Sequence, residues 1–146
     1  MRWKQLQEGE LRSFAAIFDK GDEVIADLSA FTREQKLGAA QFTGIGAFSR
    51  LTLGFFDWET KEYKRIPVEQ QVEVVALIGD VTLDESGKPT LHPHVVVSKP
   101  DGTALGGHLL KGEVRPTLEV ILHEAPAHLQ RRHDPETGLA LIRIEP

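Results

Sequence analysis

Residues 91–108 read LHPHVVVSKPDGTALGGH, two β-rich segments separated by the tripeptide Pro100-Asp101-Gly102. Proline sets φ for the first central position of a type I turn, aspartate suits the second position, and glycine takes the left-handed third. This combination predicts a three-residue hairpin loop with a glycine bulge. Residue 99 then pairs with residue 103, so paired residue numbers sum to 202, and the ladder places His94 opposite His108.

The same register brings three imidazoles together. His92 lies two residues from His94 on the same strand face, within diagonal reach of His108. Three histidines with an open fourth position are a known zinc arrangement, so we predict a divalent metal site, with zinc as the ion. Gly106 and Gly107 leave room beside it for a ligand, a water molecule or another backbone. The alternative is three separate histidines on a solvated strand face, pairing with nearby carboxylates.

Four further residues outside this hairpin are candidates for a role in catalysis, ligand approach or subunit contact. A zinc hydrolase usually needs a general base, and Glu73 and Glu113 are the two acidic candidates near the site. Glu73 is also interpreted as a solvated side chain, because its neighbours Val72 and Val74 face the other way. Gly44 and Gly46 predict either a β-bulge or a close approach to a neighbouring subunit or ligand.

The pattern in the rest of the sequence predicts one helix and several strands. Asp22 is the expected N-cap of the helix, which runs to Leu37 and stops at Gly38. Residues 125–146 are expected to form a loop and a last strand, with solvated side chains at His128, Arg131-Arg132 and His133. The pattern predicts one α+β domain, residues 1–146, with a largely antiparallel sheet. The expected strands are 12–18, 39–48, 50–56, 72–83, 91–98, 104–110, 117–123 and 139–144.

The composition is that of a globular protein rather than a disordered or fibrous one. The 146 residues are 40% hydrophobic and 27% charged, which suits a single domain. No apolar run approaches the roughly 20 residues of a membrane helix, and the first ten residues lack a signal-peptide apolar region. The absence of cysteine excludes disulfides and thiolate chemistry. We therefore expect a cytoplasmic protein without membrane contact.

Five motifs resemble one known family. FTGIGAF (residues 42–48) with LTLGFFD (51–57), VEVVALIG (72–79), and the two histidine motifs LHPH (91–94) and GGHL (106–109) follow the order found in the plants and prokaryotes conserved (PPC) domain. The resemblance covers about residues 12–124. It implies an α+β fold with a mixed, mainly antiparallel sheet and a flanking helix, a homotrimer, and a metal, usually zinc, held by His92, His94 and His108.

The resemblance also bears on function. In plants the domain follows an Arg-Gly-Arg-Pro AT-hook, and prokaryotic members are often labelled DNA-binding by that connection. This sequence contains no such motif, has Lys111 where the family commonly has an acidic residue, and carries a net charge of −5. We therefore expect no direct specific DNA binding. The favoured interpretation is a metal-binding module with a regulatory or small-ligand role, acting through a small molecule or a partner protein. The alternatives are a zinc-dependent hydrolase-like or lyase-like enzyme and a DNA-binding regulator.

Overall fold

The computed structural model describes residues 1–7, 9, 11–125 and 130–143. Within these ranges the chain forms one helix and nine strands. In chain order they are β1 (Arg2–Gln7), β2 (Ser13–Asp19), α1 (Val24–Glu34), β3 (Ala40–Asp57), β4 (Glu62–Val68), β5 (Val72–Leu83), β6 (Pro89–Ser98), β7 (Ala104–Glu124), β8 (Gln130–His133) and β9 (Ala140–Arg143).

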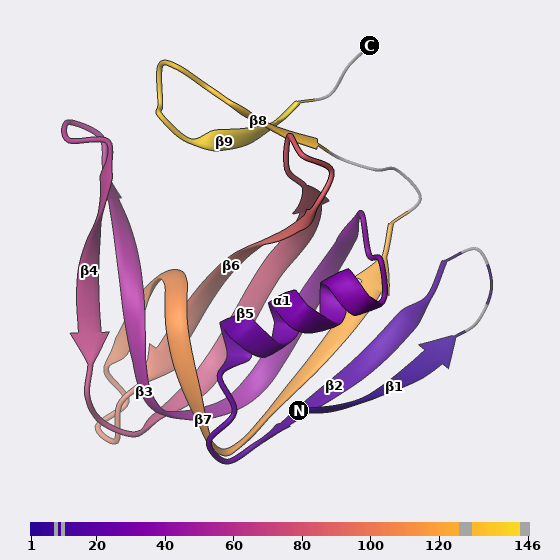
Figure 1. Cartoon of the computed structure of the whole chain (residues 1–146). Helices are drawn as coiled ribbons and strands as arrows, with labels where there is room; N and C mark the ends of the chain where they lie inside the picture. The colour runs from indigo at the N-terminus through magenta and orange to yellow at the C-terminus, as the bar shows by residue number, and fades with distance from the viewer. Residues whose placement is uncertain (8, 10, 126–129, 144–146) are drawn as a thin grey trace.

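All nine strands belong to one sheet, in the order β1-β2-β7-β3-β5-β8-β9, with β4 on β3 and β6 on both β5 and β7. The described pairings are antiparallel, except for a short parallel bridge between Leu83 of β5 and Gln130 of β8. Helix α1 crosses one face of the strongly curved sheet (Figure 1). The predicted α+β class, with a mixed, mainly antiparallel sheet and one flanking helix, is confirmed. No described helix is long and apolar enough to cross a membrane.

The core lies between α1 and the inner face of the sheet. Leu28 and Phe31 of α1 are buried, as are the alternate β2 residues Phe14, Ala16 and Phe18. The Phe14 and Phe31 rings meet edge to face with centroids 5.3 Å apart. Alternation along β2 therefore turns one face to the helix and the other outward.

The predicted helix boundaries are wrong at both ends. The N-cap is Glu23, whose carboxylate accepts hydrogen bonds from the amides of Ile25 and Ala26. The Asp22 carboxylate instead accepts from the Asp19 amide and pairs with the N-terminal ammonium of Met1. At the other end the helix stops at Glu34, because Lys36 adopts a left-handed conformation with φ of 53° before Gly38 is reached.

Two long strands replace predicted pairs of shorter ones. Residues 39–48 and 50–56 join into β3, and residues 104–110 and 117–123 join into β7, because bulges let each strand bend without ending. One bulge lies between Gly44 and Gly46 where β3 pairs with β5. Gly46 has φ of 153°, and a Cβ there would lie 2.3 Å from the Thr117 carbonyl oxygen of β7. Gly46 therefore permits the close contact between the two strands.

The predicted hairpin register is confirmed, since His94 pairs with His108 and Ser98 with Ala104.

Strands β1, β4 and β8 are not among the strands that the sequence predicts. The expected solvated loop at Arg131 is wrong, because this residue lies in β8 and is 9% exposed. His128 and the end of the expected last strand, Ile144, lie outside the described residues.

Candidate metal centre

The three predicted histidines form one cluster. His92 and His94 come from β6 and His108 from β7, and one ring nitrogen of each lies within 4.8 Å of the others. The Nε2 atoms of His92 and His94 are 3.2 Å apart. Two ligands at the 2.0–2.1 Å Zn–N distance of a tetrahedral site would be about 3.3 Å apart. The cluster therefore has nearly the spacing that a metal ion requires.

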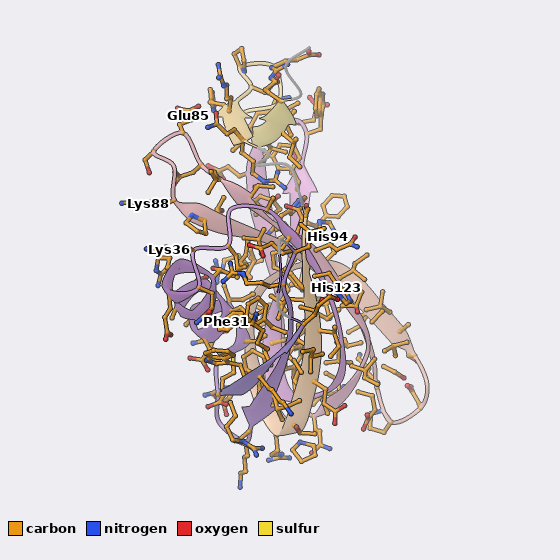
Figure 2. The ribbon with its side chains drawn as sticks, turned by 90° about the vertical axis from the view of Figure 1, so that its right-hand side faces the viewer. Phe31, Lys36, Glu85, Lys88, His94 and His123 are labelled. Atoms are coloured by element: carbon orange, nitrogen blue, oxygen red, sulfur yellow. The ribbon has the colours of Figure 1, made fainter. Side chains whose placement is uncertain are left out.

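The cluster lies on the outer face of the sheet, away from α1. Val95 and Val97 of β6 are buried in the core, so the alternate residues His92 and His94 point outward. Figure 2 shows His94 on the opposite side of the sheet from Phe31 of α1. The ion would thus be bound outside the hydrophobic core, at a surface that a ligand can reach.

His108 is the most enclosed of the three ligands. Its ring packs against Tyr63 of β4 with centroids 5.0 Å apart. Its Nδ1 is buried and has no hydrogen-bond partner among the described residues. Burial, followed by the neighbouring charges of His92, His94 and Arg131, lowers the pKa of His108 to about 4. A neutral imidazole with an unsatisfied buried nitrogen fits the requirements of a metal ligand.

A second layer of polar residues supports His92. Asp80 of β5 pairs with His92 in the β5–β6 register, and its Oδ2 lies 3.6 Å from Nδ1 of His92. The guanidinium of Arg131 donates to Oδ1 of the same carboxylate at 2.7 Å. Partial burial opposes ionisation, but interactions with His92 and Arg131 bring the pKa of Asp80 below its ordinary range. Asp80 is therefore a carboxylate in contact with a candidate ligand.

Asp80, Arg131 and Tyr63 are not among the residues that the sequence predicts for this site. The signal for Asp80 was available, because the turn before Pro89 sets paired numbers in the β5–β6 hairpin to sum to 172. No local pattern places Tyr63 or Arg131, which reach the cluster from strands that were not predicted.

The acidic candidates lie elsewhere. Glu73 is exposed and pairs with Ser98, at the other end of β6 from His92. Glu113 accepts hydrogen bonds from Arg50, whose contact, followed by that of Ser49, lowers the pKa of Glu113. Neither residue belongs to the three-histidine cluster.

Gly106 and Gly107, which precede His108, allow neighbouring strands to pack closely against β7. A Cβ on Gly107 would lie 2.8 Å from the carbonyl oxygen of Gly54, in β3. A Cβ on Gly106 would lie 3.2 Å from the carbonyl oxygen of Val95. Gly107 thus lets β7 lie against β3 next to the candidate ligand.

A groove of about 420 Å³ runs along the outer face beside the cluster. His92 and His94 line one side, and Ile78 of β5 continues the wall. Gln41 and Thr43 of β3 add polar groups. A metal ion on the three histidines would therefore be next to a space large enough for a small molecule.

A family model for the Plants and Prokaryotes Conserved domain, abbreviated PCC or PPC, matches residues 5–126. The chain belongs to this family. The predicted resemblance over residues 12–124 is thus confirmed, and the hairpin β8–β9 lies beyond the part of the PPC domain that the family model matches. A search among curated proteins found no match.

Solved structures of similar proteins show the same fold. A PPC protein from Pyrococcus horikoshii is 29% identical, with a TM-score of 0.84 over 99% of this chain and 96% of that one. A metal-containing protein from Archaeoglobus fulgidus is 32% identical, with a TM-score of 0.83 over 90% and 93%. A protein from Bacteroides thetaiotaomicron, described as a "putative DNA binding protein", is 27% identical, with a TM-score of 0.86 over 97% and 96%.

The low pKa of His108 generates a prediction for the metal-free protein. Its ring should titrate near pH 4, well below the usual value of about 6.5. The unfolded chain takes up this proton near pH 6.5 and the folded chain only near pH 4, so this residue lowers the folding stability as the pH falls through that window. An NMR titration of the ring signals, assigned with a His108→Asn variant, measures the midpoint. A midpoint at 6.5 or above would contradict the burial seen here.

Proposed function

We propose that this protein is a zinc-binding PPC module in which His92, His94 and His108 hold one ion per chain. The observation that carries the proposal is the convergence of the three rings, with the buried Nδ1 of His108 unpartnered among the described residues. The metal-containing relative from A. fulgidus supports it. We further propose a regulatory or small-ligand role, exerted through a bound small molecule or a partner protein.

The residues around the cluster have separable tasks in this proposal. A zinc ion held by the three imidazoles would leave one coordination position for a ligand and would polarise that ligand. Tyr63 covers the ring of His108, and Asp80 lies beside His92. Gln41 and Thr43 offer hydrogen-bonding groups to a ligand in the adjoining groove. Together these residues favour reversible binding of a small molecule that has a metal-coordinating atom.

The metal site is tested by elemental analysis of protein purified without chelator. Wild-type protein should contain about one divalent ion per chain, mainly zinc, and the His92→Ala/His94→Ala variant should contain almost none. His123→Ala is the matched control, because His123 lies on the outer face but hydrogen-bonds Ser13 rather than the cluster. Binding should weaken below about pH 6, since a protonated imidazole cannot ligate. Equal metal content in wild type and the double variant would refute the site.

Assembly as a homotrimer is the second part of the proposal. It is supported by apolar side chains on the outer face, where Ile45 and Ile78 are 61% and 56% exposed. With Val75 they line a hollow of about 470 Å³, and Ile78 also borders the groove beside the histidines. A contiguous apolar patch of this kind is typical of an interface, and a second copy of the chain would remove it from water.

Light scattering tests the assembly. Wild-type protein should have close to three times the chain mass of 16.2 kDa. An Ile45→Lys/Ile78→Lys variant should shift to monomer, because burying two ammonium groups without partners is costly. Leu6→Lys, which changes an exposed leucine on β1, should leave the mass unchanged. A wild-type protein that stays monomeric at micromolar concentration would exclude the trimer.

A zinc-dependent enzyme is the second candidate function. The groove beside His92 and His94 favours it, because a substrate could reach the ion. A general base is harder to find, since Glu73 and Glu113 lie elsewhere and Asp80 is held by Arg131. Hydrolytic or lyase turnover that disappears in the His92→Ala/His94→Ala variant would favour this candidate over the binding module.

Direct DNA recognition is not part of the proposal. A trimer would carry a net charge of about −15, three times the −5 of each chain, and would repel phosphates. In the Arg131-Arg132 pair, the guanidinium of Arg131 is engaged by Asp80 and Thr82. Purified protein should therefore show no sequence-dependent binding to duplex DNA at about 150 mM salt in fluorescence anisotropy. Submicromolar, sequence-dependent binding would overturn this expectation.

A further inference from the structure

Two exposed apolar patches lie at different places along strand β3. Phe55 and Ile45 are the most exposed large apolar side chains in the part of the chain that the structure describes, at 64% and 61%. Ile45 lies on the outer face of the sheet, in the hollow of about 470 Å³ that Val75 and Ile78 also line. Phe55 lies near the end of β3, where this strand pairs with β4. A single chain therefore leaves both patches in contact with water.

The patch at Phe55 belongs to a two-stranded β3–β4 arm (residues 51–68). Figure 1 shows β4 at the opposite side of the molecule from β1, away from α1. Leu53 is buried in the core, and alternation along β3 places Phe55 on the same face of the strand. Lys64 of β4 lies directly opposite Phe55, and Ile66 lies opposite Leu53. This face of the arm therefore presents an exposed aromatic ring with an ammonium group beside it.

The hollow on the outer face is complementary to the arm in size and in charge. A cavity of about 150 Å³ is enough for a benzene ring, so the hollow has room for the side chain of Phe55. Glu119 of β7 is exposed, lines the hollow and lies directly opposite Ile45. Directly opposed residues of antiparallel strands share a face. The hollow therefore has a carboxylate beside its exposed isoleucine, as the arm has an ammonium group beside its exposed phenylalanine.

The symmetry of a trimer requires two different patches on each chain. In a closed ring of three copies, every interface is heterologous, so one patch of a chain contacts a different patch of the next chain. Contact of the hollow with a second hollow would be isologous and would stop at a dimer. It would also bring two Glu119 carboxylates together, which is unfavourable. Contact of the arm with the hollow has neither problem.

We propose that the β3–β4 arm of one copy docks in the outer-face hollow of the next copy. Phe55 packs against Ile45 of the neighbouring chain, and Lys64 pairs with Glu119 across the interface. Burial of the aromatic ring supplies the apolar part of the contact, and the ion pair selects the arm over a second hollow as its occupant. The inference rests on the proposed trimer.

The docked arm also completes the groove beside the histidines. Thr43 and Ile78 line both the hollow and the groove, so the two spaces adjoin. An arm that fills the hollow forms a wall of the neighbour's groove. The space next to His92 and His94 is therefore enclosed by two chains, and a ligand that binds there contacts both.

Disulfide trapping tests the contact directly, because the chain has no cysteine of its own. A Phe55→Cys/Ile45→Cys variant should give covalent dimers and trimers on mild oxidation, as seen by non-reducing electrophoresis. The two positions lie on opposite faces of β3, ten residues apart, so a bond within one chain is excluded. The matched control, Leu6→Cys/Ile45→Cys, should remain single chains, because Leu6 is exposed on β1.

Each outcome of the trapping experiment has a definite meaning. Absence of covalent dimers in a Phe55→Cys/Ile45→Cys variant that light scattering shows to be trimeric would overturn the inference. Covalent dimers of the Ile45→Cys single variant would also overturn it, because they would show contact between two hollows. A wild-type protein that is monomeric would instead overturn the proposed trimer, so the two failures are distinguishable.

Charge reversal is an independent test that leaves the apolar contact intact. Lys64→Glu and Glu119→Lys should each weaken assembly by about tenfold, because like charges then meet across the interface. The double variant Lys64→Glu/Glu119→Lys should regain the wild-type assembly. Lys4→Glu, which reverses an exposed lysine on β1, is the matched control and should have no effect. Sedimentation velocity measures the four variants, and a double variant no better than the single ones would overturn the inference.

Discussion

The antiparallel pairing of β3 with β7 is the constraint on which the rest of the structure depends. It runs from Ala40 opposite Glu124 to Gly54 opposite His108, with bulges that let both strands bend. Strands β4 and β5 attach to β3, β2 attaches to β7, and β6 bridges β5 and β7. The close approach at Gly46, which excludes any side chain, therefore helps to place a candidate metal ligand at the far end of the same strand pair.

The two faces of this sheet have different tasks. The inner face packs against α1 and supplies most of the apolar burial, as the buried Phe14 and Phe31 show. The outer face carries the imidazoles next to exposed apolar residues such as Ile78. Enclosure of His108 by Tyr63 and the neighbouring strands lowers its pKa and keeps it neutral, which suits metal binding better than proton exchange at physiological pH. Site chemistry therefore follows from partial burial on an otherwise open face.

Charge has a local role in this protein. The Arg131-Arg132 pair does not form a free basic surface. Arg131 is buried, and its guanidinium contacts Asp80, Thr82 and His92. With a net charge of −5, the chain offers little long-range attraction to nucleic acid. Asp80 and Arg131 instead place a carboxylate and a guanidinium beside the histidine cluster.

Local sequence alone determined the β6–β7 hairpin and the convergence of His94 with His108. Turn chemistry and strand alternation involve only neighbouring residues, so the register could be worked out from Pro100-Asp101-Gly102. Only the tertiary structure decided that Arg131 is buried beside His92, from which it is separated by 39 residues. A charged side chain is buried only where distant partners satisfy it, and local sequence patterns do not specify those partners. The length of β3 and β7 was decided in the same way, since their bulges are stabilised by pairing with neighbouring strands.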